Sequence, residues 1–459
     1  MTARQRLRIL LVGLGTSVVP LDTAVNIAFP SITGNFGLPI TMIQWVVISY
    51  VLTYSSLMLA FGRAGDIWSH GRMFRIGLLW SGVAFLLCAT ASSYGWLLFC
   101  RFLQGIGASL IVSCAPALVT GLFPEYRRSR AVGVFTAIYA LGSAAGPLIG
   151  GMLVQIWGWP AVFWFRAPIA ITALLFLEGL PAAPRSEVRE AVDLVGASLL
   201  ALSISTLLLT LNQLRDLTQQ MLLPLALSAI AVASVIGFIR WEDRVAQPIV
   251  NLALFRTGSF AAVNFASVLV YLSSFAVLLF GPYYLVRSID LSPAIAGALL
   301  GTSFVGSIIA SPLAAWAIER RPPRRIAAFG AVLSGFGLMA IGYSNLGASW
   351  QILAITSALV LQGIGVGLFQ VAYMDIVMRT LPRQHRGVAG SIAMLSRSLG
   401  VVSGATLLTL AFNAIGAFDL AAGQTPAARF LSSFSLTFSA AGIASVLGGL
   451  LVLAKPGRR

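Results

Sequence analysis

Two ionisable side chains lie inside long apolar stretches, where a charge needs a partner or a water-filled cavity. Asp22 precedes Pro30, at which the first apolar stretch ends, and Arg101 follows Gly95, near which another stretch begins. A charge at the centre of a membrane helix costs about 2.5–3.5 kcal/mol on insertion scales. If both stretches cross a membrane, the two groups lie roughly 9–12 Å below the same surface. We therefore expect Asp22 and Arg101 to approach each other, directly or through Gln104 or water.

The chemistry that such a pair could perform is reversible proton binding. Burial favours the neutral carboxylic acid, whereas a neighbouring guanidinium group favours the carboxylate. A movement that separates Asp22 from Arg101 would therefore promote proton uptake. We interpret Asp22 as a protonation switch, and a fixed structural ion pair is the alternative.

A second feature is a series of small residues in the stretch from Gly133 to Gly151. Gly142, Gly146 and Gly150 recur every four residues, so they lie on one face of a helix. A neighbouring helix can come into backbone contact with such a face, as small residues allow in lipid. Pro147 removes one backbone hydrogen bond and is expected to bend the helix. An ordinary tight helix crossing is the simpler interpretation.

The elements that must position these residues are membrane-spanning helices. Of the 459 residues, 58% are hydrophobic and 10% are charged, and the mean hydropathy is +0.91. A soluble domain has about 25% charged residues, so this composition indicates a membrane protein. About fourteen stretches have the length needed to cross a bilayer, near 7–30, 42–62, 73–92, 96–120, 131–153, 160–180, 192–213, 219–240, 259–286, 293–318, 324–344, 348–374, 386–412 and 430–454.

The basic residues set the orientation of these spans. The formal net charge is +16, and the arginines form short clusters between apolar stretches, for example at 63–75, 127–130, 320–325 and 379–386. Because basic residues gather on the cytoplasmic side, both termini are expected in the cytoplasm. Clusters of this kind favour a membrane protein over a nucleic-acid-binding protein. The sequence also lacks the phosphate-binding loop typical of ATP-driven pumps.

The chain repeats itself at an offset of 258 residues, since residues 103–107 (LQGIG) recur as residues 361–365. Two parallel halves with the substrate site between them are a common design of alternating-access transporters. We therefore expect an N-terminal six-helix bundle at 1–180, a two-helix insert with linkers at 181–257 and a C-terminal six-helix bundle at 258–459.

The spans of the second half contain few charges. The positions equivalent to Asp22 and Arg101 are Phe280 and Leu359, so proton coupling is expected in the first half alone. Arg397 lies in the middle of its span, too deep to reach the membrane surface, and is expected to face a cavity.

The charges inside the spans also bear on the substrate. Three arginines, Arg101, Arg166 and Arg397, are expected within the membrane, against Asp22 as the one clear acid. Charge complementarity then favours a neutral or weakly acidic amphipathic substrate over a lipophilic cation.

Several of these residues resemble motifs of the major facilitator superfamily of transporters. The spacing of glycines and proline over 133–151 resembles the antiporter motif of its fifth helix, and 101–107 resembles its fourth-helix motif, which is linked to proton coupling. The resemblance extends to the fourteen-span drug:proton antiporters, a multidrug efflux family, through Leu21-Asp22-x3-Asn26-x3-Pro30, Gln44-Trp45, Tyr50 and Trp159 to Pro168. Arg166 departs from that pattern, because the family usually has asparagine there.

Gly62, Asp66 and Arg72 resemble the loop between the second and third helices of the superfamily, where an aspartate and basic residues clamp the cytoplasmic gate. Ile67 stands where the superfamily usually has arginine, and Ser69 and Gly71 also depart from its pattern. The clamp is therefore expected to be weaker than usual. A charged turn that only sets the topology is the alternative.

The resemblance implies an all-α integral membrane protein of the major facilitator type, with two six-helix bundles and two extra transmembrane helices. It implies a secondary active transporter, not an enzyme, that exports small amphipathic or hydrophobic compounds across the cytoplasmic membrane in exchange for protons. Asp22 and Arg101 would couple protons, and the expected cavity residues are Asn26, Trp45, Gln104, Arg166, Gln362 and Arg397.

The expected partners are a small-molecule substrate, protons and the lipid bilayer, and the chain is expected to act as a monomer. We expect no cofactor, no metal and no nucleic acid. A facilitator or symporter of an anionic metabolite is the main alternative. An integral membrane enzyme would need a cluster of His, Cys or acidic residues, and a transport-inactive receptor would lose Asp22, Arg101 or the glycine face, so the sequence favours neither.

Overall fold

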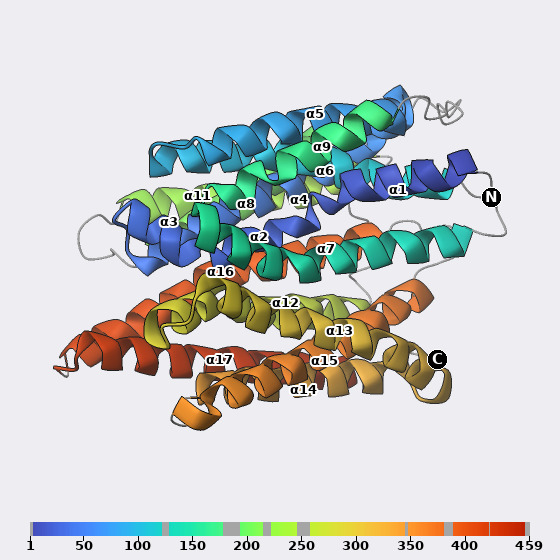
Figure 1. Cartoon of the computed structure of the whole chain (residues 1–459). Coiled ribbons are helices and arrows are strands. Elements are labelled where there is room, and N and C mark those ends of the chain that lie inside the picture. The colour runs from blue at the N-terminus through green and yellow to red at the C-terminus, as the bar shows by residue number, and fades with distance from the viewer. Residues whose placement is uncertain are drawn as a thin grey trace. The chain divides into compact units, whose positions relative to one another are not determined.

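The computed structural model is built from helices (Figure 1). It describes residues 3–121, 128–177, 193–213, 222–245, 258–344, 348–380, 389–421 and 423–454. The first elements are α1 Ala3–Ser17, η1 Pro20–Thr23, α2 Ala24–Ile27, α3 Phe29–Asn35, η2 Ile40–Ile43, α4 Gln44–Trp68, α5 His70–Ala89, α6 Tyr94–Gly121, α7 Arg128–Trp157, α8 Ala161–Trp164 and α9 Arg166–Phe176. They are followed by α10 Leu194–Gln213, α11 Leu222–Glu242, α12 Gly258–Tyr283, η6 Tyr284–Ser288, α13 Pro293–Arg320, α14 Pro323–Gly342, α15 Ala348–Thr380, α16 Ala389–Ala421 and α17 Pro426–Ala454.

Among the described residues, 12 helical segments are long and apolar enough to cross a membrane, so the chain is a multi-pass membrane protein. The expected count of fourteen is not reached, because two segments fall short. The span expected at 160–180 is the shorter segment Ala161–Phe176, which is broken between α8 and α9 next to the charged Arg166. The apolar part of the span expected at 192–213 is Ser198–Leu207.

The contacts divide the chain into two compact units. The N-terminal unit comprises residues 1–205, 234–241 and 245–249, and the C-terminal unit comprises 206–233, 242–244 and 250–459. The boundary between them runs through α10 and α11. The bundle limits expected from the sequence, at 180 and 258, remain a prediction.

The sequence repeat has a counterpart in the helix packing inside each unit. In the N-terminal unit, a Cβ atom on Gly105 of α6 would lie 2.8 Å from a backbone oxygen of α4, and one on Gly107 would lie 3.0 Å from a backbone nitrogen of α5. In the C-terminal unit, Gly363 of α15 lies against the backbone of α13 and Gly365 against the backbone of α14. The repeated glycines therefore bring one helix of each unit into backbone contact with two neighbours.

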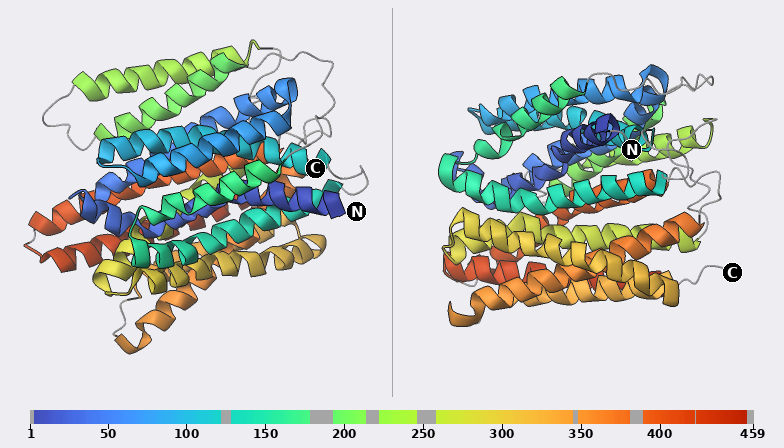
Figure 2. Two further views of the ribbon diagram at one scale, coloured as in Figure 1. Left: turned by 45° about the horizontal axis from the view of Figure 1, so that its top comes forward. Right: turned by 45° about the vertical axis from the view of Figure 1, so that its right-hand side comes forward.

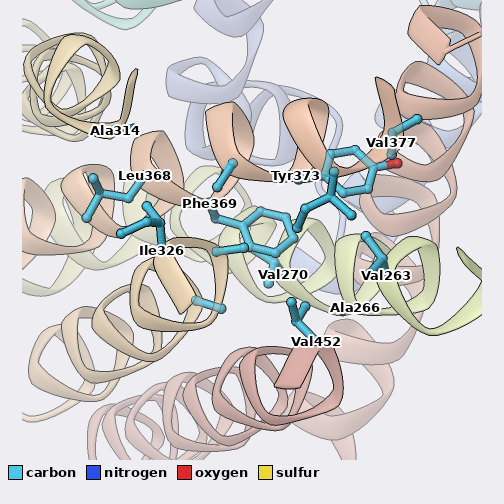
Figure 3. Packing of buried hydrophobic residues seen from close by; sticks show 14 of the residues in the cluster. Val263, Ala266, Val270, Ala314, Ile326, Leu368, Phe369, Tyr373, Val377 and Val452 are labelled. Carbon is cyan, nitrogen blue, oxygen red and sulfur yellow. The ribbon is translucent and has the colours of Figure 1, made fainter. Parts of the chain in front are cut away.

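A hydrophobic core in the C-terminal unit gathers around two stacked rings of α15 (Figure 3). The ring centroids of Phe369 and Tyr373 lie 5.7 Å apart and their planes differ by 8°. Small and branched side chains surround the rings, among them Val263, Ala266, Val270, Ile326, Val377 and Val452. In this unit α14 packs against α15 and α17 (Figure 2). Lipid is as apolar as these side chains, so close packing rather than removal from water holds the helices together.

The first apolar stretch is not one continuous helix. α1 ends at Ser17, and Pro20 lacks the N–H group that would donate to the carbonyl of Thr16 in a regular helix. The N–H of Val19 donates to that carbonyl instead, at 3.2 Å. The chain then forms the 3-10 turn η1, and this turn carries Asp22.

Candidate functional site

Asp22 forms ion pairs with two arginines from different helices of the N-terminal unit. Arg101 of α6 binds both carboxylate oxygens, with Nη1···Oδ1 at 2.7 Å and Nη2···Oδ2 at 2.9 Å. Arg166, the first residue of α9, places its Nη1 2.7 Å from Oδ1. The expected approach of Asp22 to Arg101 is confirmed, whereas the second arginine at this carboxylate was not expected.

Arg101 is held in one orientation by several groups. Its Nε donates to the carbonyl of Val46 at 2.9 Å, and its Nη1 also donates to Oε1 of Gln104 at 2.7 Å. The ring of Tyr50 lies 4.3 Å from the guanidinium carbon. Gln104 in turn donates from Nε2 to Oδ1 of Asp22 at 2.9 Å. Gln104 therefore links the arginine and the carboxylate, so that the three side chains form a closed ring of hydrogen bonds.

Arg166 is fully buried at the break between α8 and α9. α9 packs against α5 (Figure 1), and the ring of Phe85 from α5 lies 4.5 Å from the guanidinium carbon. Nε donates to the carbonyl of Val162 at 3.1 Å. The Nη2 group is buried and has no hydrogen-bond partner among the residues that the structure describes. Arg166 thus has donor capacity that its present contacts do not use.

The cluster of Asp22, Arg101, Gln104 and Arg166 combines two cations with one anion. A guanidinium group stays protonated in proteins, so both arginines stabilise Asp22 as a carboxylate. The side chain of Asp22 keeps 14% of its surface exposed, against 2% for Arg101 and 0% for Arg166. The carboxylate is therefore the accessible edge of an otherwise buried group of charges.

The glycine face of α7 packs against the broken part of the first stretch. A Cβ atom on Gly142 would lie 2.8 Å from a proline carbon of η1, and one on Gly150 would lie 2.7 Å from a carbonyl oxygen of α2. A Cβ atom on Gly146 would overlap Oγ1 of Thr23, which directly follows Asp22. The expected backbone contact is present, and its partner is the turn that carries the carboxylate.

The other residues of the glycine motif lie on the same helix. α7 continues as one helix through Pro147, which is buried, and Gly151 is buried as well. Gly133 also lies on α7. The helix therefore accommodates the missing N–H group of Pro147 without ending.

The expected gate loop is the junction between α4 and α5. Gly62 and Asp66 lie on α4, and Arg72 is an exposed residue in the first turn of α5. Ser69, between the two helices, has φ of 92°, a conformation that favours glycine. The side chain of Asp66 lies outside the described part of the chain, so the expected clamp remains a prediction.

Two of the expected cavity residues lie close in sequence to residues of the cluster or to a residue that contacts it. Asn26 of α2 is buried and donates from Nδ2 to the carbonyl of Thr23 at 3.2 Å. Trp45 is half-buried and precedes Val46, whose carbonyl holds Arg101. A role of either residue in substrate binding remains a prediction.

The other two expected cavity residues belong to the C-terminal unit. Gln362 is buried and accepts a hydrogen bond from Ser303 of α13 at 2.6 Å. The guanidinium carbon of Arg397 lies 5.5 Å from the centre of the Tyr271 ring. Gln362 occupies the position of Gln104 in the repeat, yet its partner is a neutral hydroxyl group rather than a carboxylate.

Two glycines of the C-terminal unit were missed by the sequence interpretation. Gly400 and Gly404 of α16 follow Gly142 and Gly146 at the same offset of 258 residues. A Cβ atom on either one would lie 2.7 Å from a backbone oxygen of α12. The repeat offset alone was enough to find them.

Comparisons with known proteins agree with this geometry. The sequence profile described as Major Facilitator Superfamily matches residues 10–264 and again residues 263–459. A puromycin resistance protein of Streptomyces alboniger is 30% identical over 90% of this chain and 82% of its own length. A riboflavin transporter of Clostridioides difficile is 27% identical over 88% of this chain and 87% of its own length.

A solved structure shares the fold at low sequence identity. It is that of a bacterial homolog of the human lysosomal transporter Spinster, in an inward-facing and unoccupied conformation. The TM-score is 0.70 at 15% identity, and the match covers 99% of this chain and 96% of that chain.

The contact between α7 and η1 predicts the effect of a single methyl group. Gly146→Ala would place a Cβ atom against Oγ1 of Thr23 and should lower the stability by roughly 1–3 kcal/mol, because an overpacked contact forces the backbone apart. Thermal unfolding of the purified protein in detergent measures this loss.

The matched control is Gly95→Ala, since a Cβ atom on Gly95 of α6 would have no neighbour within 4 Å among the described atoms. A second variant that adds Thr23→Ala to Gly146→Ala should recover part of the loss. Equal stability of the two single glycine variants would show that the glycine face is not a tight contact.

Proposed function

The chain belongs to the Major Facilitator Superfamily of membrane transporters, and from this premise we propose that it exports small compounds in exchange for protons. It is a transporter rather than an enzyme. In the proposal, amphipathic or hydrophobic substrates leave across the cytoplasmic membrane by alternating access, and both termini lie in the cytoplasm. The observation that carries the proposal is the partly exposed carboxylate of Asp22 between Arg101 and Arg166.

The proton step follows from the contacts of Asp22. In the arrangement seen here, two guanidinium groups stabilise the carboxylate. A shift of η1 that withdraws Asp22 from them would leave an unpaired charge in an apolar environment, and binding a proton removes this cost. Such a shift would have to break the hydrogen bond that Oγ1 of Thr23 donates to the carbonyl of Ser143 on α7, at 3.0 Å.

The direction of transport rests on the relatives. The Streptomyces alboniger protein is named for resistance to puromycin, and a transporter confers resistance when it lowers the internal concentration of a compound. The glycine and proline spacing of α7 that resembles the antiporter motif supports the same direction.

The charge balance of the cluster defines the substrate class in this proposal. Arg101 and Arg166 together exceed the charge of Asp22, and Nη2 of Arg166 is free to donate. An approaching cation would meet net positive charge, whereas a neutral or weakly acidic compound would offer oxygen acceptors. We therefore propose neutral or weakly acidic amphipathic substrates.

The same balance favours one alternative function. A facilitator or symporter of an anionic metabolite would use the excess positive charge of Arg101 and Arg166 directly. The two functions differ in their response to a pH gradient, because only the exporter releases protons from an acidified compartment when substrate is added.

We also propose that the shorter apolar helices cross the membrane, which gives fourteen spans. Nε1 of Trp241, at the end of α11, donates to Oδ1 of Asp193, immediately before α10, at 2.8 Å. Leu199 of α10 would lie 3.6 Å from a Cβ atom on Gly237 of α11. These contacts support an antiparallel pair of helices. α10 has 20 residues, so in such a pair it extends across the same thickness of the bilayer as α11.

The first prediction of the proposal concerns Asp22→Asn. The asparagine amide does not ionise near neutral pH, so addition of substrate to acidified everted vesicles should no longer release protons. The measurement is the recovery of the quenched fluorescence of a pH-sensitive dye after addition of puromycin, riboflavin or ethidium. Ethidium is expected to be the poorest substrate because it is a cation.

The matched control is Asp290→Asn, an exposed residue whose φ of 61° asparagine also tolerates. The amount of folded protein in the membrane is measured for each variant. Proton-coupled efflux that persists at the normal rate in Asp22→Asn would overturn the exchange mechanism but leave the family assignment intact.

A separate prediction concerns Arg166→Asn, which removes one of the two cations on Asp22. With Arg101 as its only remaining guanidinium partner in the cluster, Asp22 should bind a proton at a higher pH than in the unmodified chain. The pH profile of efflux should therefore move to higher pH. The control is Arg321→Asn at an exposed position between α13 and α14. An unchanged pH profile with reduced transport would assign Arg166 to structure alone.

The fourteen-span topology predicts the side from which the start of α10 is accessible. A cysteine introduced by Val195→Cys, at an exposed position, should react with a membrane-impermeant maleimide from the same side as one introduced by Arg321→Cys. If α8, α9 and α10 do not cross the membrane, the two cysteines react from opposite sides. The native Cys88, Cys100 and Cys114 are buried, so they give little background.

A further inference from the structure

The C-terminal unit contains an open cavity of about 330 Å³ at the end where α16 leads into α17, and Ala417 and Pro426 of its lining are exposed. Its volume lies within the range of about 300–1,000 Å³ that is typical of small-molecule sites. Phe412 and Phe430 contribute aromatic wall, Asn413, Arg429 and Ser433 contribute polar groups, and Gly416 leaves room between them. None of these residues belongs to the cluster around Asp22.

The polar groups of this cavity offer donors that its walls do not satisfy. Nδ2 of Asn413 and Nε of Arg429 are buried and have no hydrogen-bond partner among the described residues. Among the described residues that line the cavity, none is an aspartate or a glutamate. A buried N–H group without an acceptor costs free energy, and a ligand oxygen would recover it once the side chain turns its donor toward the cavity. The cavity is therefore suited to a ligand that brings a carboxylate.

The aromatic wall is fixed by a continuous series of ring contacts. The centroids of Phe412 and Phe430 lie 5.6 Å apart in an edge-to-face arrangement. Phe412 also stacks on Phe280, at 4.6 Å and 15°. Phe430 contacts Phe434, which stacks on Tyr284 at 4.3 Å. Rings that are held in this way present a preformed apolar face against which a flat ring can pack.

The repeat shows that this wall is a distinct feature of the C-terminal unit. Phe280 occupies the position of Asp22, at the offset of 258 residues, and Leu359 occupies that of Arg101. Phe280 therefore stacks on Phe412 at the position where Asp22 forms its ion pairs, and Phe412 itself corresponds to Val154 of α7. A ligand site next to this pair cannot be a duplicate of the charged cluster.

We propose that the cavity binds a small aromatic carboxylate. The ring packs against Phe412 and Phe430, and the carboxylate accepts hydrogen bonds from Asn413 and Arg429, whose guanidinium group supplies the positive charge. The binding step requires neither Asp22 nor a proton gradient, so the site stands whether or not the exporter is coupled to protons.

The test is equilibrium binding of radiolabelled salicylate to the purified full chain in lipid nanodiscs, with empty nanodiscs to correct for partitioning into lipid. We expect the binding to be saturable. Unlabelled salicylate should displace the radiolabelled ligand, salicylamide should displace it more weakly, and benzylamine should not displace it. Arg429→Gln should weaken the binding about tenfold or more, because a hydrogen bond to a charged group is lost. Asn413→Leu should weaken it by a smaller factor.

The matched control is Arg321→Gln, the same change at an exposed site of the C-terminal unit, which should bind salicylate as the unmodified chain does. Asp22→Asn should also bind it normally, so a failure of proton coupling and a failure of this site give different results. Absence of saturable binding, displacement by benzylamine as strong as by salicylate, or equal affinities of Arg429→Gln and Arg321→Gln would each overturn the proposal. The cluster around Asp22 is itself proposed to favour acidic over cationic compounds, so the variants assign the site. If Arg429→Gln does not fold, the comparison of Asn413→Leu with Arg321→Gln decides the test.

Discussion

The interaction on which the N-terminal unit depends is the sharing of one carboxylate by two buried guanidinium groups. A charge in an apolar environment is tolerated only with a partner, and three helical elements are fixed by this requirement: η1 by Asp22, α6 by Arg101 and α9 by Arg166. The break at Pro20 is part of the same arrangement, because it places the carboxylate on a 3-10 turn. The turn can lie close to α7 only because α7 presents glycines there.

The two halves of the chain share packing but not chemistry. Gly400 and Gly404 repeat the close contact made by Gly142 and Gly146, and the paired glycines of α6 and α15 do the same for two further helices. The ion pair of Asp22 and Arg101, by contrast, is not repeated, since the equivalent positions are Phe280 and Leu359. Backbone contacts are a requirement of the shared fold, whereas the ionisable groups are needed only once. The repeat therefore separates the glycines that the shared fold requires from the Asp22–Arg101 ion pair, which the second half lacks.

The sequence predicted the membrane class, the repeat and the Asp22–Arg101 pair, because each depends on composition, spacing or depth along a helix. Arg166 was predicted inside the membrane, but its contact with Asp22 depends on how α9 packs, and spacing along the chain does not contain that information. The expected count of fourteen spans exceeds the 12 membrane-length helices of the described residues, and an apolar run does not reveal a break such as the one before Arg166. Gly400 and Gly404 were within reach of the repeat offset, so that omission had no physical cause.

Aromatic rings lie against the guanidinium groups of three arginines. Arg101 lies over Tyr50 at 4.3 Å, Arg166 over Phe85 at 4.5 Å and Arg397 over Tyr271 at 5.5 Å. A cation–π contact contributes about 0.5–2 kcal/mol and accepts no hydrogen bond in the plane of the guanidinium group. A ring therefore offsets part of the burial cost of an arginine without competing for its N–H groups. A second carboxylate would neutralise the excess charge of the cluster, whereas a ring keeps the guanidinium group positive while it covers its face.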